Sequence, residues 1–465
     1  MLTEADLKQL DEVFSPKSIA IVGATATPDK VGYNFVDSPV TSGYQGEIYP
    51  VHPKAQEILG LKVYPSLEAI GKPIDLAIIA LNQYASVDAV ETCGRLGVKG
   101  VIAIAGGYKE MGEEGEKLQA RLIDAARRYG IKILGPNTLG MINTYADLCS
   151  VFYPLKLRKG PVSILSQSGG VGLTLMHLSQ DEGLGLSKWI GVGNRGGLEF
   201  ADLLQYLYYD DRTQVIGCFM ESTEDARGFV QMAGQTVREK PVVVYKVGES
   251  ELAQYSALTH TGTLAAPHKL TLDAFRQFGI LSVSSCQELV SVCKALSTSS
   301  LPRGPRVGVF THTAGPSIII LDELAKRGCT IPPLAKQTIK KVEQVIGENP
   351  PVILKNPLDV AGLGFAAEPF GKIAEAMLED PSIDILVAVY CLHKNWRFPT
   401  PELIAARERY QKPIIACYLS DIGSVREDRE LLAEAGIPTY TTPEAAAHAA
   451  AGLVNYATIR ERRAS

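Results

Sequence analysis

A short apolar run, a turn containing glycine and a helical pattern follow one another at three places in this chain, and this order restricts the fold more than any other feature. The apolar runs begin at Ser18, Pro161 and Arg306. A second apolar run of strand length follows later in each segment. Apolar strands that alternate with helices are typical of parallel sheets covered by helices on both faces. The sequence therefore predicts an α/β fold with three doubly wound parallel-sheet domains.

Two stretches have the composition of linkers between these domains. Residues 155–160 read Leu-Lys-Leu-Arg-Lys-Gly, and residues 297–305 are rich in Ser, Pro and Gly. The chain has 465 residues, and at roughly 150 residues per domain this length also agrees with three domains. We expect domains at 1–150, 155–300 and 304–465.

Charge and cysteine content exclude several classes of protein. Basic and acidic residues nearly balance, with 46 Lys and Arg against 51 Asp and Glu, so we expect no nucleic-acid partner. No apolar run approaches the roughly 18 residues that span a bilayer, and the N-terminus does not read as a signal peptide. The eight cysteines contain no Cys-x-x-Cys pair. We expect a cytoplasmic protein with no membrane segment, no disulfide framework and no metal site.

The turn after the first apolar run, residues 23–32, is a candidate binding loop. It lacks the Gly-x-Gly-x-x-Gly spacing that lets a dinucleotide pyrophosphate approach the backbone. A nicotinamide-binding fold also has an acidic residue after its second strand, where this chain has Lys54. These features disfavour a nicotinamide dehydrogenase and favour a ligand that carries phosphate near Lys54. The alternative, that Lys30 and Lys54 are ordinary solvated lysines, has equal weight at this point.

The loop around His260 is the candidate site of covalent chemistry. His260 lies in the polar stretch Thr-His-Thr-Gly-Thr-Leu, after a predicted strand at 241–245. Glu221 follows the predicted strand at 215–220. A carboxylate there could accept a hydrogen bond from one imidazole nitrogen and leave the other nitrogen free to attack phosphorus. A buried structural histidine is the alternative.

A predicted helix start that reads Ser-Gln-Ser-Gly-Gly is a candidate phosphate site. The N–H groups of a first helical turn and the positive end of the helix dipole can hold a phosphoryl group without a metal. An ordinary helix start is the alternative. The residues are Ser166, Gln167, Ser168, Gly169 and Gly170.

Four separated motifs follow one order along the chain: Gly-Pro-Asn at 135–137, Ser-Gln-Ser-Gly-Gly at 166–170, a glutamate after a strand, and Thr-His-Thr-Gly-Thr-Leu at 259–264. With these motifs the chain resembles the NDP-forming acyl-CoA synthetases, a family of the succinyl-CoA synthetase superfamily that includes ADP-forming acetyl-CoA synthetase. The resemblance covers essentially the whole chain. It implies a Rossmann-like CoA-binding domain followed by two flavodoxin-like domains.

The resemblance also implies a role for each candidate residue. His260 would carry the phosphoryl group, Glu221 would orient it, and the helix start at 166–170 would cradle it. CoA would lie over the first loop, with Lys54 at its phosphate-bearing end and Asn137 near the thiol. The CoA-binding residues of that loop would be Gly23, Ala24, Thr25, Pro28 and Lys30.

The third domain contains a second Thr-His-Thr triplet. By the resemblance, the helix start at Thr313, Ala314 and Gly315 would contribute to a phosphate site, and an ordinary structural loop is the alternative. His312 directly follows the first predicted strand of this domain, where a phosphate-binding loop is expected. We therefore rank His312 second to His260 as the nucleophile.

No part of the sequence is left to form an ATP-grasp fold, and no cluster of carboxylates suggests a Mg²⁺ site. The resemblance implies an α subunit that works with an ATP-grasp β subunit, which would bind ADP or ATP with Mg²⁺, in an α/β hetero-oligomer. The expected reaction is the reversible conversion of acyl-CoA, phosphate and ADP into organic acid, CoA and ATP, through an acyl phosphate and a phosphohistidine. The alternative is a non-catalytic CoA-binding sensor or scaffold.

Overall fold

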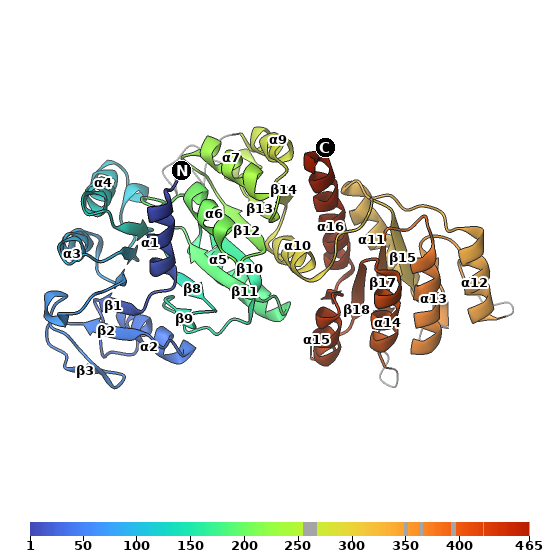
Figure 1. The fold of residues 1–465 in the computed structure, drawn as a ribbon, viewed down its shortest axis with the longest axis horizontal. Helices are drawn as coiled ribbons and strands as arrows, with labels where there is room; N and C mark the ends of the chain where they lie inside the picture. Colours follow the sequence, from blue (N-terminus) through green and yellow to red (C-terminus); the bar gives the residue numbers. More distant parts are fainter. Residues whose placement is uncertain (254–266, 348–351, 363–365, 392–396, 422, 465) are drawn as a thin grey trace. The chain divides into compact units, whose positions relative to one another are not determined.

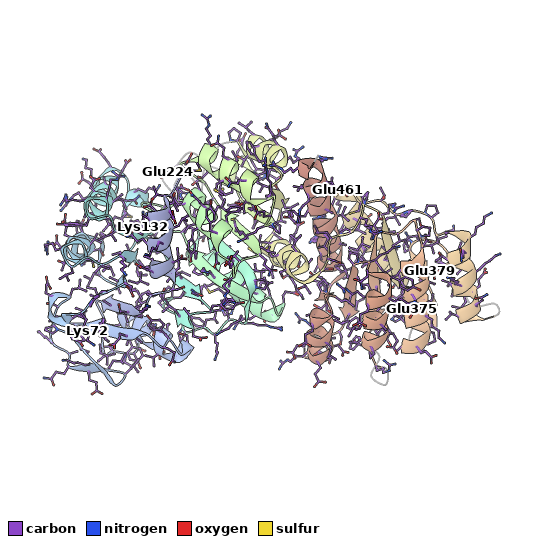
Figure 2. All side chains as sticks on the ribbon, in the orientation of Figure 1. Lys72, Lys132, Glu224, Glu375, Glu379 and Glu461 are labelled. Atoms are coloured by element: carbon purple, nitrogen blue, oxygen red, sulfur yellow. The ribbon has the colours of Figure 1, made fainter. Side chains whose placement is uncertain are left out.

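The structure is a computed structural model that describes residues 1–253, 267–347, 352–362, 366–391, 397–421 and 423–464 (Figure 1). His260 lies outside the described residues. The chain divides into two compact units, Met1–Cys286 and Gln287–Ser465. Charged side chains such as Lys72 and Glu379 lie on the outside of their units (Figure 2).

The first sheet of the first unit has the order β2-β1-β5-β6-β7, and all its strands are parallel. Ile19 and Ile21 of β1 pack in the core with α1 and α2, whereas Ala20 and Val22 pack with α3 and α4. This alternation places helices on both faces of the sheet. The elements are α1 (Glu4–Phe14), β1 (Ser18–Val22), α2 (Val31–Ser42), β2 (Glu47–Val51), β3 (Glu57–Ile58), β4 (Leu61–Lys62), β5 (Leu76–Ile79), α3 (Gln83–Arg95), β6 (Gly100–Ala103), the 3-10 turn Lys109–Met111, α4 (Glu113–Arg128) and β7 (Lys132–Leu134).

The second sheet of this unit has the order β14-β13-β12-β10-β11-β8-β9. Its strands are parallel except for the hairpin of β8 and β9, which pairs antiparallel with β11. This hairpin precedes residue 150, but its strand β8 pairs with β11, which follows it in the sequence. The elements are β8 (Met141–Asn143), β9 (Leu148–Cys149), β10 (Lys159–Ser166), α5 (Gly169–Asp181), β11 (Leu186–Gly191), α6 (Phe200–Tyr209), β12 (Val215–Met220), α7 (Ala226–Thr236), β13 (Val242–Lys246), α9 (His268–Phe278) and β14 (Leu281–Val283).

The two sheets of the first unit share one hydrophobic core. Phe14 of α1 stacks on Tyr206 of α6 with ring centroids 4.7 Å apart. The Asn143 side chain of β8 donates a hydrogen bond to the carbonyl oxygen of Phe14 at 2.8 Å. These contacts fix the two sheets relative to each other, so that residues from both can form one site.

The second unit contains a parallel sheet with the order β16-β15-β17-β18-β19. The helix α10 contributes to this unit, because the Tyr440 hydroxyl donates to the carbonyl oxygen of Ser291 at 2.8 Å. The elements are α10 (Cys286–Thr298), β15 (Val307–Thr311), α11 (Ala314–Lys326), α12 (Lys336–Ile346), β16 (Leu358–Asp359), α13 (Ala367–Glu379), β17 (Ile385–Cys391), α14 (Thr400–Tyr410), β18 (Ile414–Leu419), α15 (Arg426–Glu434), β19 (Thr439–Tyr440) and α16 (Pro443–Ala464).

The predicted fold class is confirmed, since helices alternate with the parallel strands that make up most of the three large sheets of the described residues. None of the helices in this part of the chain combines the length and the apolar character that a membrane span requires.

Candidate functional site

A cavity of about 410 Å³ lies in the first unit, at the edge where the strands β10, β11 and β12 end. The carboxyl ends of neighbouring parallel strands meet at one edge of a sheet, and ligands of doubly wound folds bind there. Predicted site residues from both sheets line this cavity: Asn137, Gln167, Ser168, Gly169, Gly170 and Glu221.

The start of α5 forms one wall of the cavity. Ser168 is the N-cap residue, and its hydroxyl accepts a hydrogen bond from the Val171 N–H at 3.5 Å. A Cβ atom on Gly170 would meet nothing within 4 Å, so the backbone at this point is open to the cavity. The N–H groups of a first helical turn have no partner within the helix, and they favour an anion.

Two of the predicted phosphate-binding side chains make hydrogen bonds within the protein instead. Ser166 is fully buried, and its hydroxyl donates to the carbonyl oxygen of Ser168 at 2.8 Å. Gln167 is also buried, and its Oε1 accepts hydrogen bonds from the backbone N–H groups of Glu221 at 2.8 Å and Ser222 at 3.0 Å. These side chains therefore shape the site, whereas the backbone of this segment faces the cavity.

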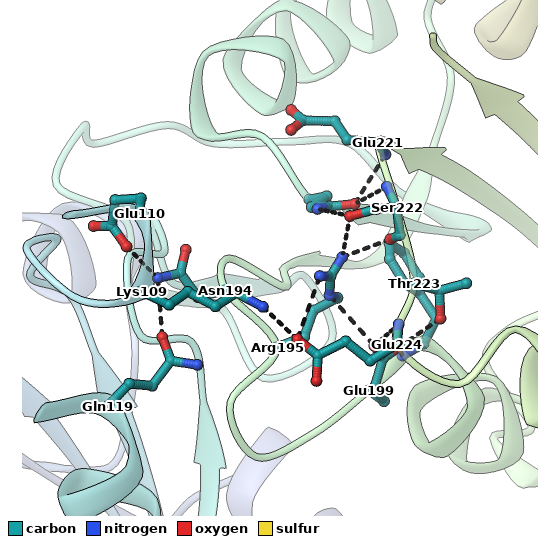
Figure 3. A network of polar contacts seen from close by, with 12 residues as sticks. Lys109, Glu110, Gln119, Asn194, Arg195, Glu199, Glu221, Ser222, Thr223 and Glu224 are labelled. Carbon is teal, nitrogen blue, oxygen red and sulfur yellow. Dashed lines mark hydrogen bonds and ion pairs between the residues drawn. The ribbon is translucent and has the colours of Figure 1, made fainter. Parts of the chain in front are cut away.

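Glu221 directly follows β12 and is 9% exposed. Figure 3 shows its carboxylate pointing away from the guanidinium of Arg195. Burial lowers the pKa of Lys246, at the end of the neighbouring strand β13, and the negative charge of Glu221 opposes this effect. The predicted hydrogen bond between Glu221 and His260 involves a residue outside the described part of the chain, so it stays a prediction.

Asn194, which also lines the cavity, and the polar residues that hold it were not predicted. Asn194 donates from Nδ2 to Glu110 at 2.6 Å and to Gln119 at 3.2 Å (Figure 3). Its Oδ1 accepts a hydrogen bond from Asn137 at 3.3 Å. Burial would raise the pKa of Glu110, but hydrogen bonds from its own backbone, from Asn194 and from two further N–H groups outweigh burial and lower it. An ionised carboxylate behind the cavity therefore holds the side chain of Asn194, which lines it.

Arg195 is a further residue that sequence reasoning missed. Its side chain is completely buried and lines the cavity beside Asn194. Burial lowers its pKa, and the negative charges of Glu199, Glu224 and Glu221 oppose this effect. A signal that could have found it is the glycine-rich stretch Gly-Val-Gly-Asn-Arg-Gly-Gly at 191–197, which begins at the last residue of β11.

The predicted CoA loops follow β1 and β2, which are parallel neighbours. Gly23 has a φ of +93°, and its carbonyl oxygen would lie 2.1 Å from a Cβ atom on Gly32, so the loop packs tightly onto the start of α2. Lys30 and Lys54 are both exposed. The predicted residues Ala24, Thr25 and Pro28 lie between Gly23 and Lys30, and of these Pro28 is exposed.

The second unit holds the remaining predicted residues. Thr313 is the N-cap of α11, and Ala314 and Gly315 form its first turn, where a Cβ atom on Gly315 would meet nothing within 4 Å. His312 is buried, and its Nε2 accepts a hydrogen bond from the N–H of Cys391 at 2.8 Å. Burial lowers the pKa of His312, and the charge of Asp359 opposes this effect. His312 is therefore a neutral structural residue in this arrangement.

Comparison with known proteins matches two families. Residues 17–144 match the model of a CoA binding domain, and residues 159–296 match that of a succinyl-CoA ligase like flavodoxin domain. The chain is 36% identical over 456 residues to the alpha subunit of the ADP-forming acetate–CoA ligase II of Pyrococcus furiosus, covering 96% of this chain and 98% of the relative.

Longer relatives and solved structures agree with this match. The ADP-forming acetate–CoA ligase I of Archaeoglobus fulgidus is 35% identical over 97% of this chain, which spans 64% of that relative. The structure of the dinucleotide-forming acetyl-coenzyme A synthetase 1 of Ca. Korarchaeum cryptofilum, in complex with phosphate and ADP, has a TM-score of 0.87 at 30% identity and covers 97% of both chains. Together with the cavity between a CoA-binding and a ligase-like segment, these similarities identify the chain as a member of the ADP-forming acyl-CoA ligase family, in which it matches two alpha subunits over 97–98% of their length.

Proposed function

We propose that this chain is the alpha subunit of an ADP-forming acyl-CoA ligase, which converts acyl-CoA, phosphate and ADP reversibly into organic acid, CoA and ATP. The observation that carries the proposal is the cavity at the start of α5, which is lined by Asn137, by the backbone of Ser168, Gly169 and Gly170, and by Glu221. The relatives named as acetate–CoA ligases support the same activity.

The first step places phosphate at the start of α5. The N–H groups of the first turn and the helix dipole stabilise the dianion there, while CoA extends over the loops after β1 and β2 toward Asn137. A phosphate oxygen attacks the thioester carbon, the carbon–sulfur bond breaks, and the CoA thiolate leaves and takes up a proton. The product in the cavity is an acyl phosphate.

The second step transfers the phosphoryl group to His260. One neutral imidazole nitrogen attacks phosphorus, the bond between phosphorus and the acyl oxygen breaks, and the carboxylate leaves. Glu221 accepts a hydrogen bond from the other imidazole nitrogen, which orients the ring and stabilises the positive charge that develops on it. Phospho-His260 then donates the group to ADP, and the phosphorus–nitrogen bond breaks.

The last transfer requires a partner, and we propose an ATP-grasp β subunit that holds ADP and Mg²⁺. The name "alpha subunit" of two relatives supports a partner chain, and the longer single-chain relatives support a covalently joined equivalent. We also propose that Thr313, Ala314 and Gly315, at the start of α11, bind phosphate during this transfer, and that the complex works in the cytoplasm.

The test is the covalent intermediate itself. The purified chain is incubated with acetyl-CoA and radiolabelled phosphate, and label that is acid-labile and base-stable is counted on the protein. We expect labelling of the wild type, none in His260→Ala, and much slower labelling in Glu221→Gln. The matched control is His177→Ala, an exposed histidine of α5, which should label normally. A wild type that binds CoA without labelling, or label that survives His260→Ala, would favour the non-catalytic CoA-binding alternative.

A further inference from the structure

Four consecutive residues after β12, Glu221 to Glu224, are held by side chains from elsewhere in the second sheet. Gln167, at the end of β10, holds the first half of this turn. Its Oε1 accepts the N–H groups of Glu221 at 2.8 Å and Ser222 at 3.0 Å, and its Nε2 lies 3.4 Å from the Ser222 hydroxyl, to which it donates. One amide side chain thus satisfies two backbone donors that would otherwise be buried without partners.

Arg195, after β11, contacts the same turn from the other side. Its Nη1 donates to the carbonyl oxygen of Ser222 at 2.5 Å and to the Ser222 hydroxyl at 3.1 Å (Figure 3). The backbone at Arg195 has a φ of +57°, a conformation that is costly for a side-chain-bearing residue. A completely buried guanidinium on strained backbone requires surrounding structure that holds it in place, and the turn supplies part of it.

Glu199, the N-cap residue of α6, holds the second half of the turn. Its carboxylate accepts hydrogen bonds from the Thr223 hydroxyl at 3.2 Å and from the Glu224 N–H at 3.1 Å. It also lies 3.3 Å from Nε of Arg195, so the two clamping side chains form an ion pair with each other. Because Arg195 is buried, this pair is little screened by solvent.

The turn is also tied to the CoA-binding segment. Lys109, between β6 and α4, forms an ion pair with the carboxylate of Glu224 (Figure 3). Lys109 lies within residues 17–144, which match the CoA-binding family model, whereas Glu224 lies within the ligase-like match. The position of the turn therefore depends on residues of both sheets.

We propose that Gln167, Arg195 and Glu199, which we call the clamp, are positioning residues that fix the direction of the Glu221 carboxylate for phosphoryl transfer. This inference rests on the proposed function, because it assigns the clamp no role except through Glu221. Catalytic groups must be held within a fraction of an ångström of their working position, and a 1 Å displacement can cost about 100-fold in rate. The clamp restricts the motion of the turn that carries Glu221. Without these contacts, a turn at the end of a strand would move more.

The experiment measures the single-turnover rate of histidine labelling from acetyl-CoA and radiolabelled phosphate in clamp variants of the full chain. Gln167→Leu removes the side-chain oxygen that accepts hydrogen bonds from the N–H groups of Glu221 and Ser222, and it leaves the side-chain volume nearly unchanged. Glu199→Gln removes the negative charge of this side chain without changing its size. The control for the first is Gln180→Leu, an exposed glutamine of α5 that donates to the carbonyl oxygen of Lys156 at 3.2 Å. The control for the second is Glu239→Gln, an exposed carboxylate that accepts from the Tyr208 hydroxyl at 2.6 Å.

We expect the clamp variants to label about 10- to 100-fold more slowly, with the KM for phosphate changed by less than about twofold, while both controls label normally. The decisive comparison is the double variant Gln167→Leu with Glu221→Gln. It should label no more slowly than Glu221→Gln alone, because Gln167 acts through Glu221.

Two results would contradict the positioning role of the clamp without contradicting the proposed function. One is a normal labelling rate in both clamp variants alongside slow labelling in Glu221→Gln. The other is a full additional loss in the double variant, which would mean that Gln167 acts independently of Glu221. Absence of label in the wild type would instead overturn the proposed function, and the clamp with it. If Gln167→Leu does not fold, the double variant Glu199→Gln with Glu221→Gln is compared with Glu221→Gln alone.

Discussion

Asn137 and Asn194 lie side by side in the lining of the cavity, although 57 residues separate them in the sequence: Nδ2 of Asn137 donates to Oδ1 of Asn194 at 3.3 Å. Asn137 follows the last strand of the first sheet, and Asn194 follows a strand of the second. The pair therefore joins the two sheets at the point where we expect the thiol end of CoA to meet phosphate.

Asn137 also has a backbone φ of +57°, which allows a test that separates its backbone from its side chain. Asn137→Gly and Asn137→Ala both remove the amide, but alanine strains the left-handed backbone and glycine does not. We expect Asn137→Ala to unfold in urea with about 1 kcal/mol less free energy than Asn137→Gly. Both variants should raise the KM for acyl-CoA. Equal stability of the two variants would contradict the strain argument.

Lys54 is proposed to bind the phosphate-bearing end of CoA. Lys54→Ala should weaken CoA binding roughly fivefold, about 1 kcal/mol, since an exposed lysine–phosphate contact is modest and screened by salt. Binding of dephospho-CoA, which lacks the 3′-phosphate, should not change. Calorimetric titration of both ligands measures the difference, with Lys8→Ala on α1 as the control. An equal loss of affinity for both ligands would mean that Lys54 does not contact the 3′-phosphate. Protection from unfolding by NADH would instead support the nicotinamide-binding alternative.

Gly170 and Gly172, two residues apart on α5, should respond to alanine in opposite ways. A Cβ atom on Gly172 would lie 2.4 Å from Cζ2 of the buried Trp189, so Gly172→Ala should cost about 1–3 kcal/mol of stability. A Cβ atom on Gly170 would meet nothing within 4 Å, so Gly170→Ala should fold at least as stably as the wild type. Gly170→Ala should nevertheless raise the KM for phosphate, because its methyl group enters the cavity. An unchanged KM for phosphate in Gly170→Ala would contradict the proposal that phosphate binds at the start of α5.

The second unit should lose stability in acid through Glu323. Hydrogen bonds from Lys326 and His448, together with Arg327, lower its pKa from 4.5 to about 2, although burial acts in the opposite direction. A lowered pKa in the folded state means that the ionised group stabilises the fold above pH 4.5, and that this contribution disappears as the pH falls toward 2.

The variant that tests this is Glu323→Gln. It should be less stable than the wild type at pH 7 and should show a shallower loss of unfolding free energy between pH 4.5 and pH 2. Denaturant titrations across this range give the slope, and Glu408→Gln, an exposed carboxylate of α14, is the control. Identical slopes for the wild type and Glu323→Gln would contradict the prediction.

The alternation of apolar strands with helices determined much of this protein from its sequence. The run Ser-Ile-Ala-Ile-Val at 18–22 is buried on both faces, and such a strand is stable only between helices in a parallel sheet. Strand ends could also be read directly, which is why the predicted helix start at Ser168 and the predicted position of Glu221 after β12 agree with the structure.

Only the tertiary structure decided which polar groups meet. The order of strands in the second sheet places the end of β10 between those of β11 and β12, and this order brings Gln167 to the backbone of Glu221. From the sequence we predicted Gln167 as a phosphate-binding residue, and we singled out neither Arg195 nor Glu199. A hydrogen bond is a short-range, directional contact between groups far apart along the chain, so local sequence cannot specify its partners. The sequence thus predicted the edge of the sheet at which the candidate cavity lies, and packing determined which side chains meet there.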